Sequence, residues 1–244
     1  MQGLQPPRFL TARWIHLAMA NYEVDPAELL PLVPEGTELD FCSGKCFVSV
    51  VGFQFLDTRV LGIPVPFHRD FEEVNLRFYV KRKVGAEIRR GVVFVKEIVP
   101  RRALAWVANA VYNEKYVALP MSHDDRLSDS PGTLTYSWRH HGEWSRLGVT
   151  IEGDAYLPDE TSEAAFITEH YWGYTVQRDG STLEYKVEHP RWNVWRCARQ
   201  ELDCNAAALY GSAFARCLAA EPTSCFVADG SEIVVRRGTR CELP

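Results

Sequence analysis

Polar residues that could do chemistry alternate along the segment Phe71–Lys81. Side chains of an extended strand point alternately to its two faces. One face of this strand would therefore carry four polar side chains in a row: Glu73, Asn75, Arg77 and Tyr79. In the lining of a barrel, such a row could bind a carboxylate ligand and transfer a proton. The same row could also be the solvated outer face of an antiparallel sheet.

Glu73 and Arg77 lie too far apart on this strand to bond directly. Four residues at ~3.3 Å each separate them by about 13 Å. A buried charge without a partner is strongly unfavourable, so on a cavity wall each needs a partner from elsewhere. We expect these partners, or a bound ligand or water, in other segments. The candidate residues are Tyr112, Glu114, Lys115, His170, Trp172 and His189.

A second cluster, Glu169–Tyr174 with Glu188–Trp192, combines aromatic and ionisable residues. Such residues can line a mostly apolar ligand pocket, or they can pack a sheet edge with their polar tips on backbone partners. On the pocket interpretation, the candidate catalytic residues are Glu73 and Lys115. The candidate substrate-binding residues are Arg77, Asn75, Tyr79, Tyr112, His170, Trp172 and His189.

Lysine is scarce, with six residues against 21 arginines. Schiff-base chemistry needs a lysine whose pKa is lowered by burial or by a neighbouring cation. Lys115 follows the predicted helix Arg101–Tyr112. Lys96 would share one face of a predicted strand with the apolar Val92, Phe94 and Ile98. Either could supply an amine, although lysine is rarely fully buried and both could be surface residues.

The pattern of apolar and turn residues predicts strands throughout the chain, interrupted by few helices. The expected strands are Cys46–Leu56, Phe71–Lys83, Gly91–Val99, Thr133–Arg139 and Leu147–Tyr156, with hairpins over Tyr171–Glu188 and Phe226–Arg236. The expected helices are a short one capped by Asp25 and two longer ones, Arg101–Tyr112 and Asn205–Ala220, and a polar loop is expected at His123–Gly132. We therefore predict an α+β fold, a single domain over residues 1–244 whose mostly antiparallel sheet closes into a barrel or cone.

Composition excludes several classes of protein. The 244 residues carry a net charge of −5, whereas nucleic-acid-binding domains are usually basic. No apolar run approaches the ~18 residues of a membrane span, and the N-terminus lacks signal-peptide features, so we expect a cytoplasmic protein. The seven cysteines are odd in number. Cys42 and Cys46 are spaced like one pair of zinc ligands, but no second Cys or His pair follows at such a spacing, and no glycine-rich phosphate loop is present. We expect free thiols, no metal and no cofactor, and leave a homo-oligomer open.

Several segments resemble the uncharacterised bacterial YqjF-like family. These are Phe9–Trp14, Asn21–Pro26, Phe71–Val80, Glu169–Tyr174 and Ala228–Ser231. The resemblance implies an acetoacetate decarboxylase-like fold, a cone-shaped antiparallel barrel with a central cavity and external helices. It therefore favours a cavity lined by the polar row.

The resemblance does not extend to the decarboxylase motif. Acetoacetate decarboxylases place their nucleophilic lysine in a Gly-Phe-Pro-Lys-Lys sequence, and a strand glutamate and an arginine complete their site. Glu73 falls where that glutamate lies, but Asn113–Tyr116 holds only one lysine and no proline. Three hypotheses remain: an enzyme acting on a small organic acid or carbonyl compound, a non-catalytic barrel that binds a small molecule, and an interaction or structural protein with a filled core.

Overall fold

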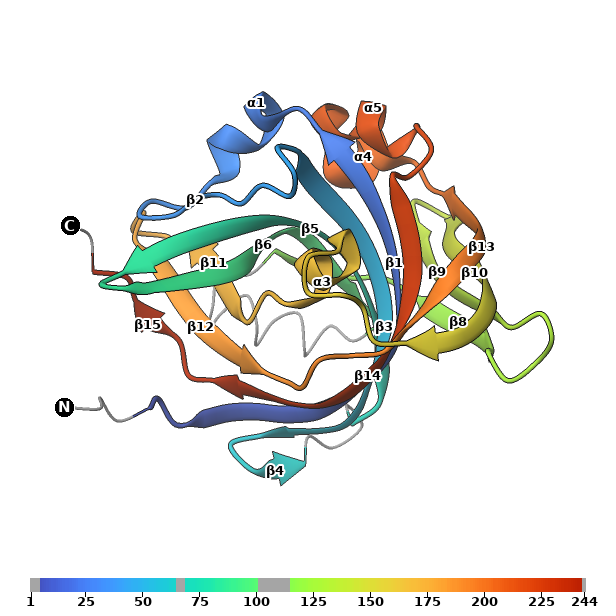
Figure 1. Cartoon of the computed structure of the whole chain (residues 1–244), viewed down its shortest axis with the longest axis horizontal. Helices are drawn as coiled ribbons and strands as arrows, with labels where there is room; N and C mark the ends of the chain where they lie inside the picture. Colours follow the sequence, from blue (N-terminus) through green and yellow to red (C-terminus); the bar gives the residue numbers. More distant parts are fainter. Residues whose placement is uncertain (1–4, 65–68, 101–114, 243–244) are drawn as a thin grey trace.

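The computed structural model describes residues 5–64, 69–100 and 115–242 (Figure 1). Fifteen strands of these ranges form one sheet. The strands are β1 (Arg8–Val24), β2 (Glu38–Leu39), β3 (Cys46–Val60), β4 (Ile63–Pro64), β5 (Phe71–Val84), β6 (Glu87–Val99), β7 (Tyr116–Ala118), β8 (Met121–Arg126), β9 (Thr133–His140), β10 (Glu143–Tyr156), β11 (Trp172–Val176), β12 (Thr182–Glu188), β13 (Val194–Asp203), β14 (Ser224–Arg236) and β15 (Thr239–Arg240). The helices are α1 (Pro26–Leu29), the 3₁₀ turn η1 (Leu30–Leu32), α3 (Glu163–Thr168), α4 (Ala206–Tyr210) and α5 (Ser212–Leu218).

The central part of the sheet closes on itself. Strands lie in the order β12-β11-β6-β5-β3-β1-β14, and β14 also pairs with β12, which completes a ring. Within the described ranges, the pairings are antiparallel apart from those of β6 with β11 and with β7. Figure 1 looks into this ring and shows α1, α4 and α5 outside it, at one end. The predicted fold, an antiparallel cone with external helices, is confirmed.

A second layer covers part of the ring from outside. Beyond β14 the sheet continues through β13, β10, β9 and β8. Tyr136 and Trp138 of β9 are buried in one core cluster with Leu76 and Phe78 of β5. The apolar face of β5 therefore packs against this layer, so its polar face points into the ring. The alternative that Glu73 and Asn75 face solvent is overturned, since they are 2% and 1% exposed.

Two glycines explain where the predicted elements differ from the observed ones. Gly230 does not close a hairpin: β14 is one continuous strand in which Gly230 has φ +83° and lies against the backbone of Trp14. The predicted helix Asn205–Ala220 is two helices, because Gly211 separates α4 from α5 at φ +96°. Only glycine adopts such conformations without strain.

The structure confirms some of the other predicted features and differs from others. The Asp25 cap is confirmed, since its side chain accepts from the Ala27 N–H at 2.9 Å. Part of the expected loop His123–Gly132 belongs to β8, and β1 and α3 were not predicted. The predicted helix Arg101–Tyr112 lies outside the described residues. No helix within the described ranges is long and apolar enough to span a membrane.

Candidate functional site

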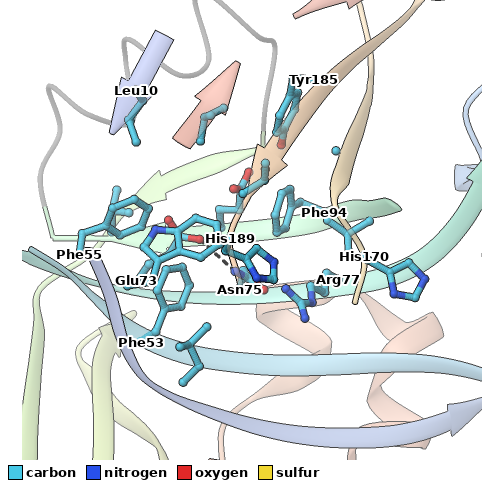
Figure 2. Close-up of a pocket in the computed structure, with 18 of the residues that line it drawn as sticks. Leu10, Phe53, Phe55, Glu73, Asn75, Arg77, Phe94, His170, Tyr185 and His189 are labelled. Carbon is cyan, nitrogen blue, oxygen red and sulfur yellow. Dashed lines mark hydrogen bonds between the residues drawn. The ribbon is translucent and has the colours of Figure 1, made fainter. Parts of the chain in front are cut away.

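A cavity of about 170 Å³ lies inside the ring (Figure 2). The inner face of β5 forms one wall, with Phe71, Glu73, Asn75 and Arg77 in sequence along it. A cavity of similar size, ~150 Å³, holds a benzene molecule in another protein. The space therefore fits a ligand of roughly six to eight non-hydrogen atoms.

Aromatic residues line the end of the cavity next to Phe71. Phe55 of β3 stacks on Phe71 with ring centroids 4.6 Å apart, and Trp14 of β1 makes edge contacts with Phe53 and Phe55 at 5.2 and 5.6 Å. The strand register fixes this arrangement, because Trp14 lies opposite Phe55 and Phe55 opposite Phe71. This end can bury an apolar group.

Glu73 lies between the aromatic end and Arg77, and its side chain points into the cavity (Figure 2). Asn75 Nδ2 donates to Oε1 at 2.9 Å, and the Tyr116 hydroxyl donates to Oε2 at 3.2 Å. Burial raises the pKa of Glu73 to about 7, against the opposing effects of both hydrogen bonds and of the Arg77 charge. Near neutral pH this carboxyl group can both donate and accept a proton.

Arg77 provides positive charge at the opposite end. Its Nη2 donates to the Ile167 carbonyl at 3.2 Å, and its Nε donates to the Tyr79 hydroxyl at 3.4 Å. The guanidinium also lies 5.6 Å from the centre of the Tyr79 ring. Among the described residues, no carboxylate forms an ion pair with it. A partly buried guanidinium without a carboxylate partner is suited to binding an anion.

His170 adjoins this end and is held by two residues behind it. Its Nε2 lies 3.2 Å from Asp40 Oδ2, which also accepts from Arg90 Nε at 2.6 Å. Burial lowers the pKa of His170 to about 4, in opposition to the hydrogen bond with Asp40. The ring is therefore neutral at pH 7. Burial raises the pKa of Asp40, but the hydrogen bonds from His170 and Arg90 outweigh it and lower the pKa overall.

His189 and Trp172 border both the cavity and an outer groove. The groove is also lined by Glu87, Ile88, Arg90, Glu169, Tyr171, Lys186 and Glu188. His189 stacks on Trp192 with centroids 4.0 Å apart, and its Nδ1 lies 2.8 Å from the Pro190 carbonyl. Burial lowers the pKa of His189 to about 4. Both residues therefore lie between the cavity and the groove.

Tyr79 has a different position from the one predicted. It faces the interior of the ring but is not among the residues that line the cavity. Its hydroxyl lies 2.6 Å from Ser49 Oγ and accepts from Arg77. Because Tyr79 is 1% exposed and fixed by these contacts, it holds the guanidinium rather than touching a ligand.

All six lysines lie within the described ranges, and none of them lines the cavity. The predicted position of Lys115 in the cavity is wrong: its side chain is exposed. The physical reason is the alternation of neighbouring residues, because the next residue, Tyr116, points inward. Lys115 therefore points away from Glu73.

A β-bulge removes Lys96 from the cavity. Lys96 pairs with Leu76, whereas Phe94 pairs with Arg77, so Val95 is an extra residue in β6. An extra residue shifts the alternation of side chains by one position. Phe94 and Glu97 line the cavity, and Lys96 lies on the outer side with Leu76. Burial and the nearby ammonium of Lys115 lower the pKa of Lys96.

Of the other predicted residues, Tyr112 and Glu114 lie outside the described residues. Sequence reasoning missed Tyr116, Trp14 and Asp40. Tyr116 directly follows a residue that was named, and Trp14 belongs to a segment quoted for the family resemblance. Asp40 had no signal, since β2 is only two residues long and its contact with His170 spans 130 positions.

The described residues contain no group of three or more His, Cys, Asp or Glu side chains that could hold a metal ion. All seven cysteines are free thiols in the structure. Cys197 and Cys225, on the neighbouring strands β13 and β14, have sulfur atoms 2.7 Å apart. These thiols belong to the outer core and not to the cavity.

Solved structures share this fold at low sequence identity. Acetoacetate decarboxylase from Legionella pneumophila has a TM-score of 0.66 at 12% identity, covering 98% of this chain and 90% of its own. The enduracididine biosynthesis enzyme MppR complexed with pyruvate has a TM-score of 0.66 at 13% identity, covering 98% and 91%. An acetoacetate decarboxylase-like enzyme from Sphingomonas wittichii RW1 has a TM-score of 0.65 at 16% identity, covering 98% and 95%. At these identities the likeness shows the fold alone.

Comparison of the sequence with protein-family profiles identifies a family. A comparison with curated proteins finds no match. The profile of DUF2071, described as an uncharacterized conserved protein, matches residues 11–232. The match covers most of the chain, including the polar row of β5 and, apart from Phe9 and Leu10, the segments that carry the family resemblance. The chain therefore belongs to the DUF2071 family.

Proposed function

We propose that the cavity binds a small carboxylic acid with an apolar body. The observation that carries the proposal is Arg77, the guanidinium on the wall of a cavity with an aromatic end, which forms no ion pair with a described carboxylate. A partly buried guanidinium with no carboxylate in ion-pair contact attracts an anion, so this end of the cavity favours one. The bound pyruvate in the MppR structure is a small carboxylate too.

The opposite end supports an apolar body for this ligand. Trp14, Phe53, Phe55 and Phe71 surround it, and burying each methylene group there contributes ~0.8 kcal/mol. Glu73 between the two ends is compatible with an anion when it is protonated. Because its pKa is about 7, we expect anion affinity to fall as the pH rises through 7.

The binding test uses 3-methylbutanoate, a branched acid of seven non-hydrogen atoms, in isothermal titration calorimetry at pH 6. We expect saturable binding that Arg77→Gln weakens at least about tenfold, because a charge-assisted hydrogen bond contributes roughly 1.5–3 kcal/mol. The neutral analogue 3-methylbutan-1-ol should bind more weakly than the acid. Arg199→Gln, on the exposed face of β13, is the matched control and should leave the affinity unchanged.

Two outcomes would contradict the binding proposal. One is equal affinity for the acid in the Arg77→Gln and Arg199→Gln variants. The other is equal affinity of the wild-type protein for the acid and the alcohol. Either result would mean that the guanidinium does not hold the carboxylate.

A second candidate function is proton transfer to or from the bound ligand. The observation that favours it is Glu73, which is buried in the cavity and titrates near pH 7. A carboxylate so placed can remove a proton from a carbon next to a carbonyl group. Schiff-base chemistry is not part of this proposal, since none of the six lysines lines the cavity.

The proton-transfer test follows 2-oxo-3-methylbutanoate in D₂O by proton NMR. We expect the signal of the C3 hydrogen to disappear faster with wild-type protein than with Glu73→Gln, because the amide cannot accept the proton. The variant also measures exchange caused by the buffer. Equal rates for both proteins would leave a binding protein and remove the catalytic candidate.

A further inference from the structure

The polar atoms around the Arg77 end of the cavity include a surplus of hydrogen-bond acceptors. Asn75 Oδ1 and His170 Nδ1 are both buried, and neither has a hydrogen-bond partner among the described residues. Buried acceptors in folded proteins are normally paired, and leaving one unpaired is costly. These two atoms therefore mark positions where a ligand can supply a donor.

The acceptor character of His170 follows from its surroundings. Burial lowers the pKa of His170 to about 4, so the ring carries one proton at pH 7. Asp40 faces Nε2, and a carboxylate that Arg90 keeps ionised holds the proton on that nitrogen. The lone pair is thus on Nδ1. His189 follows the same logic, since its Nδ1 hydrogen is directed at the Pro190 carbonyl and Nε2 keeps the lone pair.

The acceptor character of Asn75 follows from Glu73. Asn75 Nδ2 donates to Glu73 Oε1, which orients the amide and leaves Oδ1 free of described partners. Asn75 also lies between Glu73 and Arg77 on the cavity wall, two residues from each (Figure 2). If a ligand carboxylate binds at Arg77, a group on the neighbouring carbon of the ligand would therefore lie nearest to Asn75.

We infer that the ligand is a hydroxy acid, with its carboxylate at Arg77 and the O–H of the neighbouring carbon donating to Asn75 Oδ1. This inference rests on the proposed function, because Arg77 must hold the carboxylate. A keto oxygen is only an acceptor and would face another acceptor at Asn75. An ammonium group could donate, but the Arg77 guanidinium would repel it. A hydroxyl group is the donor that fits both neighbours.

The test compares three acids that share one carbon skeleton. They are 3-methylbutanoate, 2-hydroxy-3-methylbutanoate as each enantiomer, and 2-oxo-3-methylbutanoate, titrated into the wild-type protein at pH 6. We expect one enantiomer of the hydroxy acid to bind at least about tenfold more tightly than the other two acids, as a satisfied buried acceptor would give. In Asn75→Leu this preference should fall below about twofold. Asn193→Leu, on an exposed loop, is the control and should keep the preference.

The series separates the inference from the proposed function. If all three acids bind with similar affinity and Arg77→Gln weakens them, the hydroxyl preference is overturned and the carboxylate site remains. If no acid binds, the proposed function fails and the inference fails with it. A hydroxyl preference that persists in Asn75→Leu would overturn the assignment to Asn75. Should that variant fail to fold, the affinity ratio of the wild-type protein still decides whether a donor is preferred.

Discussion

Glu73 is a residue whose burial should make the stability of the protein depend on pH. Its pKa is raised by burial from an ordinary value of 4.5 to about 7, so the folded state keeps it protonated where the unfolded chain has lost the proton. The contribution of protonated Glu73 to the free energy of unfolding is complete below pH 4.5 and is lost as the pH rises through 7. At about 1.4 kcal/mol per pH unit, the loss amounts to roughly 3 kcal/mol.

We therefore expect Glu73→Gln, which stays neutral, to gain stability relative to the wild type between pH 4.5 and 7.5. Urea unfolding at several pH values measures this gap, which should widen by roughly 3 kcal/mol. Glu35→Gln removes a carboxylate from an exposed position and serves as the control. A gap between Glu73→Gln and wild type that stays constant with pH would show that Glu73 is not buried as a neutral acid.

The sequence identified the β5 wall of the site together with His170, Trp172 and His189, which also line the cavity, but it did not identify Tyr116, Trp14 and Asp40. Alternation along one strand is a local property, and it predicted which residues of β5 share a face. Tyr116 and Trp14 belong to other strands and Asp40 follows β2. Their contacts with Glu73, with Phe53 and Phe55, and with His170 depend on tertiary pairing. Local pattern carries no information about such contacts, so the position of these residues at the site is seen only in the structure.

At the level of elements, Gly230 should control how β1 and β14 pair. A Cβ atom at Gly230 would lie 2.1 Å from the Trp14 carbonyl oxygen, and its φ is +83°. Gly44 has a similar φ of +80° but open space where its Cβ would be. Comparison of the two alanine variants therefore separates the steric contact from the backbone strain.

We expect Gly44→Ala to lower the free energy of unfolding by about 1–2 kcal/mol, the usual cost of the left-handed conformation. Gly230→Ala should cost at least about twice as much, because backbone atoms must also move apart. Urea denaturation of both variants measures the difference. Equal losses would contradict the close approach at Gly230, and with it the position of Trp14 at the aromatic end.

Irregularities within the strands explain where sequence reasoning about elements failed. The prediction for Lys96 assumed unbroken alternation in β6, and the extra residue Val95 reverses it. The Asp229-Gly230 pair is typical of a hairpin turn. Here Gly230 lies within the continuous strand β14 and allows the backbone of β14 to approach that of β1 at Trp14. The register of β14 with β1 is unbroken at Gly230, so neither this close approach nor the extra residue in β6 is marked by the local sequence pattern.

For the whole molecule, strand content predicted the closed sheet, and the family resemblance predicted the central cavity. The second layer, formed by β8, β9, β10 and β13, was not predicted as a separate layer. Its buried residues, such as Tyr136 and Trp138, alternate with less buried residues along β9. Any sheet with one covered face has this pattern, so the pattern does not indicate a second layer. This layer matters for function because it covers the apolar side of β5 and leaves the polar side for the cavity.

We propose that the ring encloses a carboxylate site with Arg77 at one end and aromatic residues at the other. The most direct measurement is a crystal structure of the protein with 3-methylbutanoate bound. We predict the carboxylate within hydrogen-bonding distance of the Arg77 guanidinium and the two methyl groups against Phe53 and Phe55. An acid bound with its carboxylate away from Arg77, or bound only in the outer groove beside Lys186, would contradict the account.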